Sequence, residues 1–368
     1  MASIASIPAM RSRALAIMAT RSQDQHLVSD VANRLPVRDP SFPAEDPSCA
    51  VIPSFGWHPW FSHQLYDDSS PNPTYQTRDD HGESQAKSAH YAAVLAPSPG
   101  PDDQAFLSSL PTPTPLSSLL SSTRSLLSSY PNALVGEIGL DKAFRLPRQW
   151  DSADAASRDG ALTPGGREGR MLSPHRVRPQ HQQAILTAQL RLAGEMGRPV
   201  SIHGVQAHGI LYNTVAACWK GHEREVVSRR QQRLAAPGAE SESEPEEDPT
   251  SAVGGKPFPP RICLHSFTGS VEVLHQWLNR STPAAIFFSF SPAVNLGTEG
   301  GRKKLADVVA QVPDDRILVE SDLHTAGEDM DAALEEMYRL VCEMKGWDLE
   351  EGVRRIGGNF REFIFGSR

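Results

Sequence analysis

Short apolar runs that favour β-strands recur along the chain, and amphipathic stretches with helical spacing lie between several of them. The clearest amphipathic stretch is Gln180–Met196, in which Ile185, Leu186 and Leu190 fall on one side of a helix. Further helices are predicted at Val271–Leu278, Arg302–Val309 and Met330–Lys345. The strand-like runs are Ala14–Ala19, Cys49–Phe55, Ala133–Ile138, Pro199–His203, Arg261–His265, Ala285–Ser291 and Arg316–Glu320.

This alternation indicates βα units around a parallel sheet, and therefore an α/β fold. We expect a single domain over residues 1–368 that forms a (β/α) barrel of the TIM type with long loop insertions. A closed barrel of this type has eight strands, whereas the pattern gives seven runs. Because Ala2–Met10 has the pattern of a helix remnant, we expect Ala14–Ala19 to be the second strand and the first strand to be absent.

Three stretches interrupt the repeating pattern. Residues 62–115 mix Pro, Ser, Asp and His around one short apolar stretch, and residues 149–178 are rich in Gly, Arg and Ser. Residues 219–260 have a basic half followed by an acidic half, a composition that buries too little apolar surface to fold alone, so we predict a disordered insertion there. All three follow strands and could gate a site or recruit a partner, or they could be solvated loops without a role.

Composition limits the binding partners and the cellular location that we expect for the protein. The net charge of −8 gives no general nucleic-acid footprint, although a metal and a local basic rim can still hold a phosphodiester. The four cysteines form no CxxC pair, which favours reduced thiols and a cytoplasmic or nuclear location. No apolar run approaches the ~18 residues of a membrane span. Arginines without acidic residues before Asp24 allow a mitochondrial transit peptide, but the strand at Ala14–Ala19 favours a folded N-terminus.

Four of the strand-like runs have, within two residues of their ends, a residue that binds divalent metals, namely Glu137, His203, His265 and Asp322. Taken singly, each has an ordinary alternative: a turn glutamate, two hydrogen-bonded core histidines and a helix-capping aspartate. Taken together, they lie in order on separate strands, at the end where barrel active sites form. The pattern therefore predicts one metal site built from all four.

Two imidazoles and two carboxylates suit a divalent ion such as zinc or manganese, and Glu137 could bridge two ions. A bound metal lowers the pKa of its water, and two metals ~3.5–4 Å apart can clamp both oxygens of a phosphodiester displacement. Asp322 could bind metal or take the proton from the attacking water. We therefore expect one or two divalent ions, with magnesium as a further candidate.

At these residues the sequence resembles the TatD-type metal-dependent hydrolases, within the amidohydrolase-like barrels. The matching motifs are Gly56-Trp57-His58-Pro59, Gly136-Glu137-Ile138-Gly139-Leu140-Asp141, Gln189-Leu190 through Arg198-Pro199-Val200 to His203, His265-Ser266-Phe267-Thr268-Gly269, Glu320-Ser321-Asp322 and Gly358-Asn359-Phe360, the last at the start of the terminal helix. The long loops and the Ser289-Phe290-Ser291-Pro292 segment look most like a fungal branch that is described as binding a TPR subunit of the anaphase-promoting complex.

The resemblance implies roles for single residues. Glu137 would be the shared ligand, His203 and His265 would hold one ion, and Asp322 would hold the other and help to activate water. His58 would support the site, contact substrate or serve the structure. The family's first strand ends in His-x-His, which this sequence lacks, so we expect a chain that is truncated at its N-terminus.

Three functions compete at this point. The first is a metal-dependent hydrolase acting on ester bonds, a deoxyribonuclease-like phosphodiesterase whose substrate is DNA or another phosphoester. The second is a catalytically impaired barrel that serves as a protein-interaction scaffold, which the missing His-x-His favours. The third is another amidohydrolase-like barrel, which is disfavoured because many of those use a carbamylated lysine where this chain has Glu137.

Overall fold

The computed structural model describes residues 2–42, 48–77, 82–149, 170–226, 255–297 and 300–366. Its main element is a seven-stranded sheet in the order β1-β2-β6-β8-β9-β10-β11, with every neighbouring pair parallel. The order along the sheet follows the order along the chain, as in a βα barrel. The predicted α/β barrel architecture is thereby confirmed, with seven strands in the main sheet of the described residues.

The strands of this sheet lie where the apolar runs predicted them, with small differences at their ends. Four of them end one residue earlier than predicted and β2 ends at Phe55 as predicted. The strands β6 and β8 continue past Ile138 and His203 because they pair with one another as far as Asp141 and Val205. The bounds are β1 Ala14–Met18, β2 Ala50–Phe55, β6 Leu134–Asp141, β8 Val200–Val205, β9 Arg261–Leu264, β10 Ala285–Phe290 and β11 Ile317–Val319.

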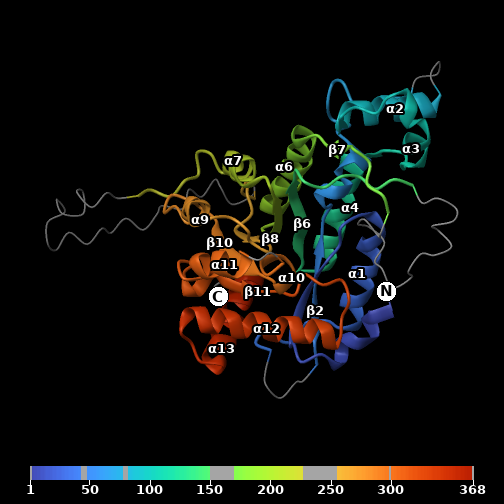
Figure 1. Ribbon diagram of the computed structural model, residues 1–368. Helices are drawn as coiled ribbons and strands as arrows, with labels where there is room; N and C mark the ends of the chain where they lie inside the picture. The colour runs from blue at the N-terminus through green and yellow to red at the C-terminus, as the bar shows by residue number, and fades with distance from the viewer. Residues whose placement is uncertain are drawn as a thin grey trace.

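Helices follow most strands and cover the outer face of the sheet (Figure 1). The four predicted helices are confirmed as α6, α9, α11 and α12. The bounds are α1 Ser22–Arg34, α4 Leu116–Ser129, α6 Pro179–Glu195, α7 His208–Cys218, α9 Val271–Trp277, α10 Pro292–Asn295, α11 Gly301–Val309, α12 Glu328–Lys345 and α13 Leu349–Phe365. Short 3-10 helices are η1 Ala2–Ala9, η2 Pro59–Gln64, η3 Pro101–Asp103 and η4 Asp314–Arg316.

One expectation about the last helix was wrong. Asn359 lies well inside α13, not at its start, because Asp348 caps the helix by accepting the backbone N–H of Glu351. From that interior position Asn359 donates to the carbonyl oxygens of Asp314 and Ile317, at 2.8 and 2.9 Å. It therefore ties the terminal helix to the start of β11.

The core around the main sheet has two parts, because successive strand residues point to opposite faces of a sheet. In β10, Ile286, Phe288 and Phe290 pack outward against the helices, whereas Phe287 faces the barrel interior. The interior cluster is completed from the last helix by Phe363, whose ring centroid lies 5.4 Å from that of Phe287. The end of α13 thus covers one end of the barrel interior, and polar residues lie at the opposite end.

The described part of residues 62–115 contains more regular structure than its composition predicted. Helix α2 buries Tyr91 and Val94 against Leu107 of α3, and these two helices lie together beyond the end of the sheet (Figure 1). Their small cluster of apolar side chains is what offsets the polar composition. The bounds are β3 Leu65–Tyr66, α2 Glu83–Val94, β4 Leu95–Ala96, α3 Gln104–Ser109, β5 Thr114–Pro115 and β7 Arg176–Val177, with β3 pairing β5 and β4 pairing β7.

Most of the other two insertions lies outside the described residues, namely 150–169 of the stretch 149–178 and 227–254 of the stretch 219–260. Within the described residues, no helix is both long and apolar enough to cross a membrane. The four cysteines are buried and unpaired, as the absence of a CxxC pair predicted.

Candidate metal centre

The candidate ligands converge at the polar mouth of the sheet. His58 follows β2, Glu137 lies in β6, His203 lies in β8, His265 follows β9 and Asp322 follows β11. Since these strands are parallel, all five side chains are delivered to the same end. The structure thus brings together the four residues that the sequence predicted as ligands, and it places His58 beside them.

Glu137 is the centre of the cluster. Its Oε1 lies 2.9 Å from His203 Nδ1, 3.5 Å from His58 Nε2 and 3.7 Å from His265 Nε2. The side chains of Glu137, His203 and His265 are each at most 13% exposed. One carboxylate oxygen therefore faces three imidazoles from three other strands.

The glycines beside Glu137 explain this placement. The register of β6 against β8 shifts between Val135 and Ile138, which is a bulge that re-aims the side chain between them. Gly139 pairs with His203 at φ +153°, and a Cβ there would lie 2.0 Å from the His203 carbonyl oxygen. Only glycine allows β6 and β8 to approach this closely, and the approach is what brings Glu137 to His203.

His58 is oriented by the turn that follows it. Pro59 begins η2, and the backbone N–H of Trp60 donates to His58 Nδ1 at 3.2 Å. Its Nε2 is thereby directed at Glu137, and its ring lies 4.4 Å from that of His203. The sequence suggested a supporting role for His58, whereas the structure places it in one group with Glu137 and His203, whose ligand atoms lie within 4.8 Å of one another.

The other side of Glu137 carries a second pair of candidate ligands. His265 Nε2 lies 3.1 Å from Asp322 Oδ1, and the Asp322 side chain is 31% exposed. Asp322 has φ +54°, a conformation that costs a non-glycine residue of the order of 1–3 kcal/mol and is concentrated at functional sites. The more open position of Asp322 makes it the carboxylate of this cluster that solvent reaches most readily.

Two further carboxylates belong to the site, although no role was predicted for them from the sequence. Asp141 Oδ2 lies 3.2 Å from His203 Nε2 and accepts the indole N–H of Trp60 at 2.6 Å. Glu320 Oε2 lies 2.7 Å from His265 Nδ1. Both residues stand in the motifs that carried the resemblance, and a carboxylate at the end of a strand next to a histidine strand was the signal that could have identified them.

Burial and charge act in opposite directions on the pKa values here. Burial favours the neutral form of Glu137, but the charges of His265 and His58 and the hydrogen bond from His203 outweigh it and hold the pKa of Glu137 well below its ordinary value. Burial likewise lowers the pKa of His203, but its carboxylate neighbours Asp141 and Glu137 raise it to about 9. The same cause raises the pKa of His265 well above its ordinary value. Burial lowers the pKa of His58, so the cluster stabilises positive charge at His203 and His265 but not at His58.

The donor set fits divalent metal. Zinc binds imidazole nitrogen and carboxylate oxygen at about 2.0–2.2 Å in tetrahedral geometry, so its ligand atoms lie about 3.4 Å apart. The separations of Glu137 Oε1 from His203 and His58, at 2.9 and 3.5 Å, bracket that value. A divalent cation would take the place of the protons that the carboxylates now stabilise on the imidazoles, which is the usual competition at such sites.

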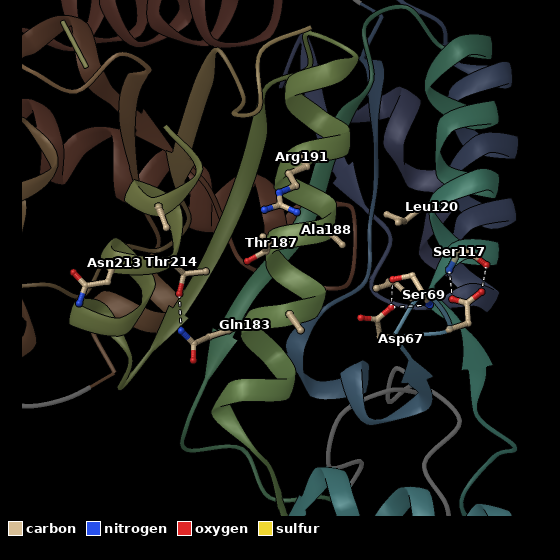
Figure 2. A pocket seen from close by; sticks show the side chains of 14 residues that line it. Asp67, Ser69, Ser117, Leu120, Gln183, Thr187, Ala188, Arg191, Asn213 and Thr214 are labelled. Atoms are coloured by element: carbon tan, nitrogen blue, oxygen red, sulfur yellow. Dashed lines mark hydrogen bonds between the residues drawn. The ribbon is translucent and has the colours of Figure 1, made fainter. Parts of the chain in front are cut away.

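A cavity elsewhere in the molecule has a different character from the metal centre. A cavity of about 580 Å³ opens among α4, α6, α7 and the loop at Asp67–Ser69 (Figure 2). Its carboxylates are already engaged, since Asp67 accepts from Ser69, and Asp68 accepts from the backbone N–H and the hydroxyl of Ser117 at the start of α4. None of the candidate metal ligands lines this cavity, so the metal centre is the candidate active site.

Comparison with known proteins agrees with this architecture. Residues 44–365 match the family model described as TatD related DNase. The chain is 35% identical over 350 residues to the Cut9-interacting protein scn1 of Schizosaccharomyces pombe, covering 95% of this chain and 91% of that protein. It is 27% identical over 323 residues to the uncharacterized deoxyribonuclease YMR262W of Saccharomyces cerevisiae, covering 85% and 82%.

Solved structures resemble the fold. The crystal structure of YjjV, a TatD homologue from Escherichia coli K12, has a TM-score of 0.50 with 14% identity and covers 100% of this chain and 92% of its own. That of an uncharacterized amidohydrolase from Saccharomyces cerevisiae has a TM-score of 0.52 with 14% identity and covers 98% and 91%. At this identity the likeness concerns the fold alone.

Proposed function

We propose a function that starts from the family to which the chain belongs, the TatD related DNase family. The chain would be a metal-dependent hydrolase of ester bonds whose substrates are phosphodiesters such as DNA. The observation that carries the proposal is the single oxygen of Glu137 that faces His58 and His203 on one side and His265 on the other. A carboxylate in that position can be shared between two ions. The relative described as a deoxyribonuclease supports the choice of substrate.

We propose that His58, Glu137 and His203 hold one divalent ion and that Glu137, His265 and Asp322 hold a second. This grouping differs from the one that the family resemblance implied, in which His203 and His265 shared an ion, because His203 lies beside His58 and His265 lies beside Asp322. Zinc, manganese and magnesium are the candidates. When bound, such ions lower the pKa of a water molecule to give a nucleophile near neutral pH and neutralise charge on the phosphate.

The residues of the chain would then do the following work. Asp322, the more exposed carboxylate, receives the proton of the attacking water. Glu137 remains ionised, since its pKa is held well below the ordinary value, and keeps the charge that retains the cations. The Trp60 indole, stacked on Phe144 with ring centroids 4.5 Å apart, forms an apolar wall beside His58 and His203 that limits access of bulk water.

The test is metal content together with hydrolysis. The purified chain should retain about one to two equivalents of divalent metal and hydrolyse bis(p-nitrophenyl) phosphate and DNA oligonucleotides. Glu137→Ala should lose both. Glu195→Ala is the matched control, because Glu195 is an exposed carboxylate at the end of α6 that pairs with Arg124 of α4, away from the metal centre. Metal and hydrolysis that survive in Glu137→Ala, or that are absent from the parent chain supplied with each metal, would contradict the proposal.

A second candidate function is protein interaction, and the name of the fission-yeast relative favours it. We propose a TPR protein of the anaphase-promoting complex as the partner, which would place the chain in the nucleus or cytoplasm. The test is co-elution of the two purified proteins in size-exclusion chromatography, with the parent chain and with Glu137→Ala. Binding that is equal for both would separate a scaffold function from the metal centre, and failure of the parent chain to bind would end this candidate.

A further inference from the structure

Each of the two histidines that face Glu137 from the ends of β8 and β9 has a carboxylate next to both of its ring nitrogens. His203 has Nδ1 at 2.9 Å from Glu137 and Nε2 at 3.2 Å from Asp141. His265 has Nε2 toward Glu137 and Asp322, and Nδ1 at 2.7 Å from Glu320. In both rings one nitrogen faces the centre of the cluster and the other faces a carboxylate behind it.

The carboxylate behind His203 is fixed by its own surroundings. Asp141 Oδ1 accepts the backbone N–H groups of Ala143 and Phe144, at 2.7 and 2.8 Å. Its Oδ2 accepts the indole N–H of Trp60 while it faces His203. Its backbone is held too, since Gln182 accepts from the Asp141 N–H and donates to the Asp141 carbonyl, both at 2.8 Å. Asp141 therefore cannot turn toward the centre without losing these bonds.

The carboxylate behind His265 is fixed in the same manner by different atoms. Glu320 Oε1 accepts both the backbone N–H and the hydroxyl of Ser266, each at 2.6 Å. The Ser266 hydroxyl lies 2.7 Å from that of Ser291, which anchors it to the end of β10. Glu320 Oε2 is left for His265 Nδ1, at a distance of an ion pair although not in the alignment of an ideal hydrogen bond.

From these contacts we infer that Asp141 and Glu320 are positioning residues, which set the ring orientation of His203 and His265 so that one nitrogen of each is presented to the ions. A carboxylate favours the tautomer that carries its proton on the nearer nitrogen, and the lone pair then lies on the other nitrogen. For His203 the free nitrogen is Nδ1 and for His265 it is Nε2, and both face Glu137. The inference rests on the proposed metal-dependent function.

The two carboxylates are not ligands themselves, because the oxygen of each that does not face a histidine is occupied by two protein donors. The amide variants Asp141→Asn and Glu320→Gln keep the shape of the side chain and remove its charge. In metal sites, loss of such a partner of a ligand histidine weakens metal binding about tenfold to a hundredfold. We expect that loss for both variants, with the unfolding midpoint close to that of the parent chain.

The measurement is Co²⁺ affinity, by competition with a chromogenic chelator, together with the visible spectrum of the bound Co²⁺. A misoriented imidazole changes the spectrum of the bound ion, whereas a general loss of stability lowers only the amount bound. Asp103→Asn is the matched control, since Asp103 also faces an imidazole, with its Oδ1 3.5 Å from His175 Nε2, but lies in the insertion around α3. That variant should bind Co²⁺ like the parent chain.

The outcomes separate this inference from the function on which it rests. Parent-like affinity and spectrum in both Asp141→Asn and Glu320→Gln, with binding lost in Glu137→Ala, overturn the positioning roles and leave the metal site standing. A parent chain that binds no Co²⁺ overturns both. Should Asp141→Asn fail to fold because its backbone-capping bonds are lost, Glu320→Gln decides the inference alone.

Discussion

The closest backbone approach beside the metal centre gives the sharpest prediction. We expect Gly139→Ala to separate β6 from β8, because the new Cβ would lie 2.0 Å from the carbonyl oxygen of His203, where ordinary contacts begin at 3.4 Å. The new Cβ is attached directly to the backbone of β6 and meets backbone atoms of His203, so no side-chain rotation relieves the clash. The two strands must therefore move apart by about 1 Å or more.

The size of the effect follows from two costs. At φ +153° an alanine is strained by about 1–3 kcal/mol, and the displacement of a buried strand pair adds to it, so we expect a loss of at least about 3 kcal/mol in the free energy of unfolding. Glu137 and His203 lie on the two strands that separate. A misplacement of about 1 Å at a reacting centre can reduce a rate about a hundredfold, so hydrolysis should fall further than stability alone explains.

The assay is denaturant unfolding with hydrolysis measured on the same samples, and two other glycines serve as controls. A Cβ at Gly197 meets nothing within 4 Å, but the residue has φ +63°. Gly197→Ala therefore carries the strain of a positive φ without a steric clash. Gly209→Ala, in α7, meets nothing within 4 Å and has no positive φ, so it should be neutral or slightly stabilising. If Gly139→Ala is no more destabilised than Gly197→Ala and remains active, the close approach does not position His203 as argued.

Three further predictions concern the rest of the molecule. Burial lowers the pKa of His90 to about 4, below its unfolded value near 6.5, so the stability it contributes is present above about pH 6.5 and lost as pH falls toward 4. The free energy of unfolding, measured by denaturant titration, should therefore drop over that window by an amount on the order of 2–3 kcal/mol, and by less in His90→Gln. Trp277→Ala, at a residue 1% exposed, should cost about 3–5 kcal/mol in urea unfolding, whereas Val353→Ala, at 48% exposed, should cost under about 0.5 kcal/mol. Burial raises the pKa of Cys263 to about 12, so Ellman's reagent at pH 8 should label this thiol only after unfolding, and a rapid reaction in the native chain would contradict the packing.

Much of the sheet could be predicted because its strands are short and apolar and most of them are buried on both faces. Runs such as Ala285–Phe290 contain no polar residue to compete for a solvated conformation until Ser289, and each is bounded by residues that favour turns. The insertion around α2 was harder, because its apolar residues are spaced among serines and prolines and gain burial by meeting Leu107 of α3 together with Leu146 and Val177. Long-range contact, not local pattern, decides such a helix.

The candidate ligands were predictable for a reason that did not extend to their grouping. Since the order of strands in the sheet equals their order in the chain, Glu137, His203 and His265 had to lie on adjacent strands, and the strand-end rule then placed them together. Which ring nitrogen faces which carboxylate depends on the turn after β2, on the bulge in β6 and on the continuation of β6 to Asp141. None of these leaves a periodic trace in the sequence. His58 shows the consequence: it follows a strand as the other histidines do, yet only the bond from Trp60 to its Nδ1 turns its Nε2 toward Glu137 and makes it a candidate ligand.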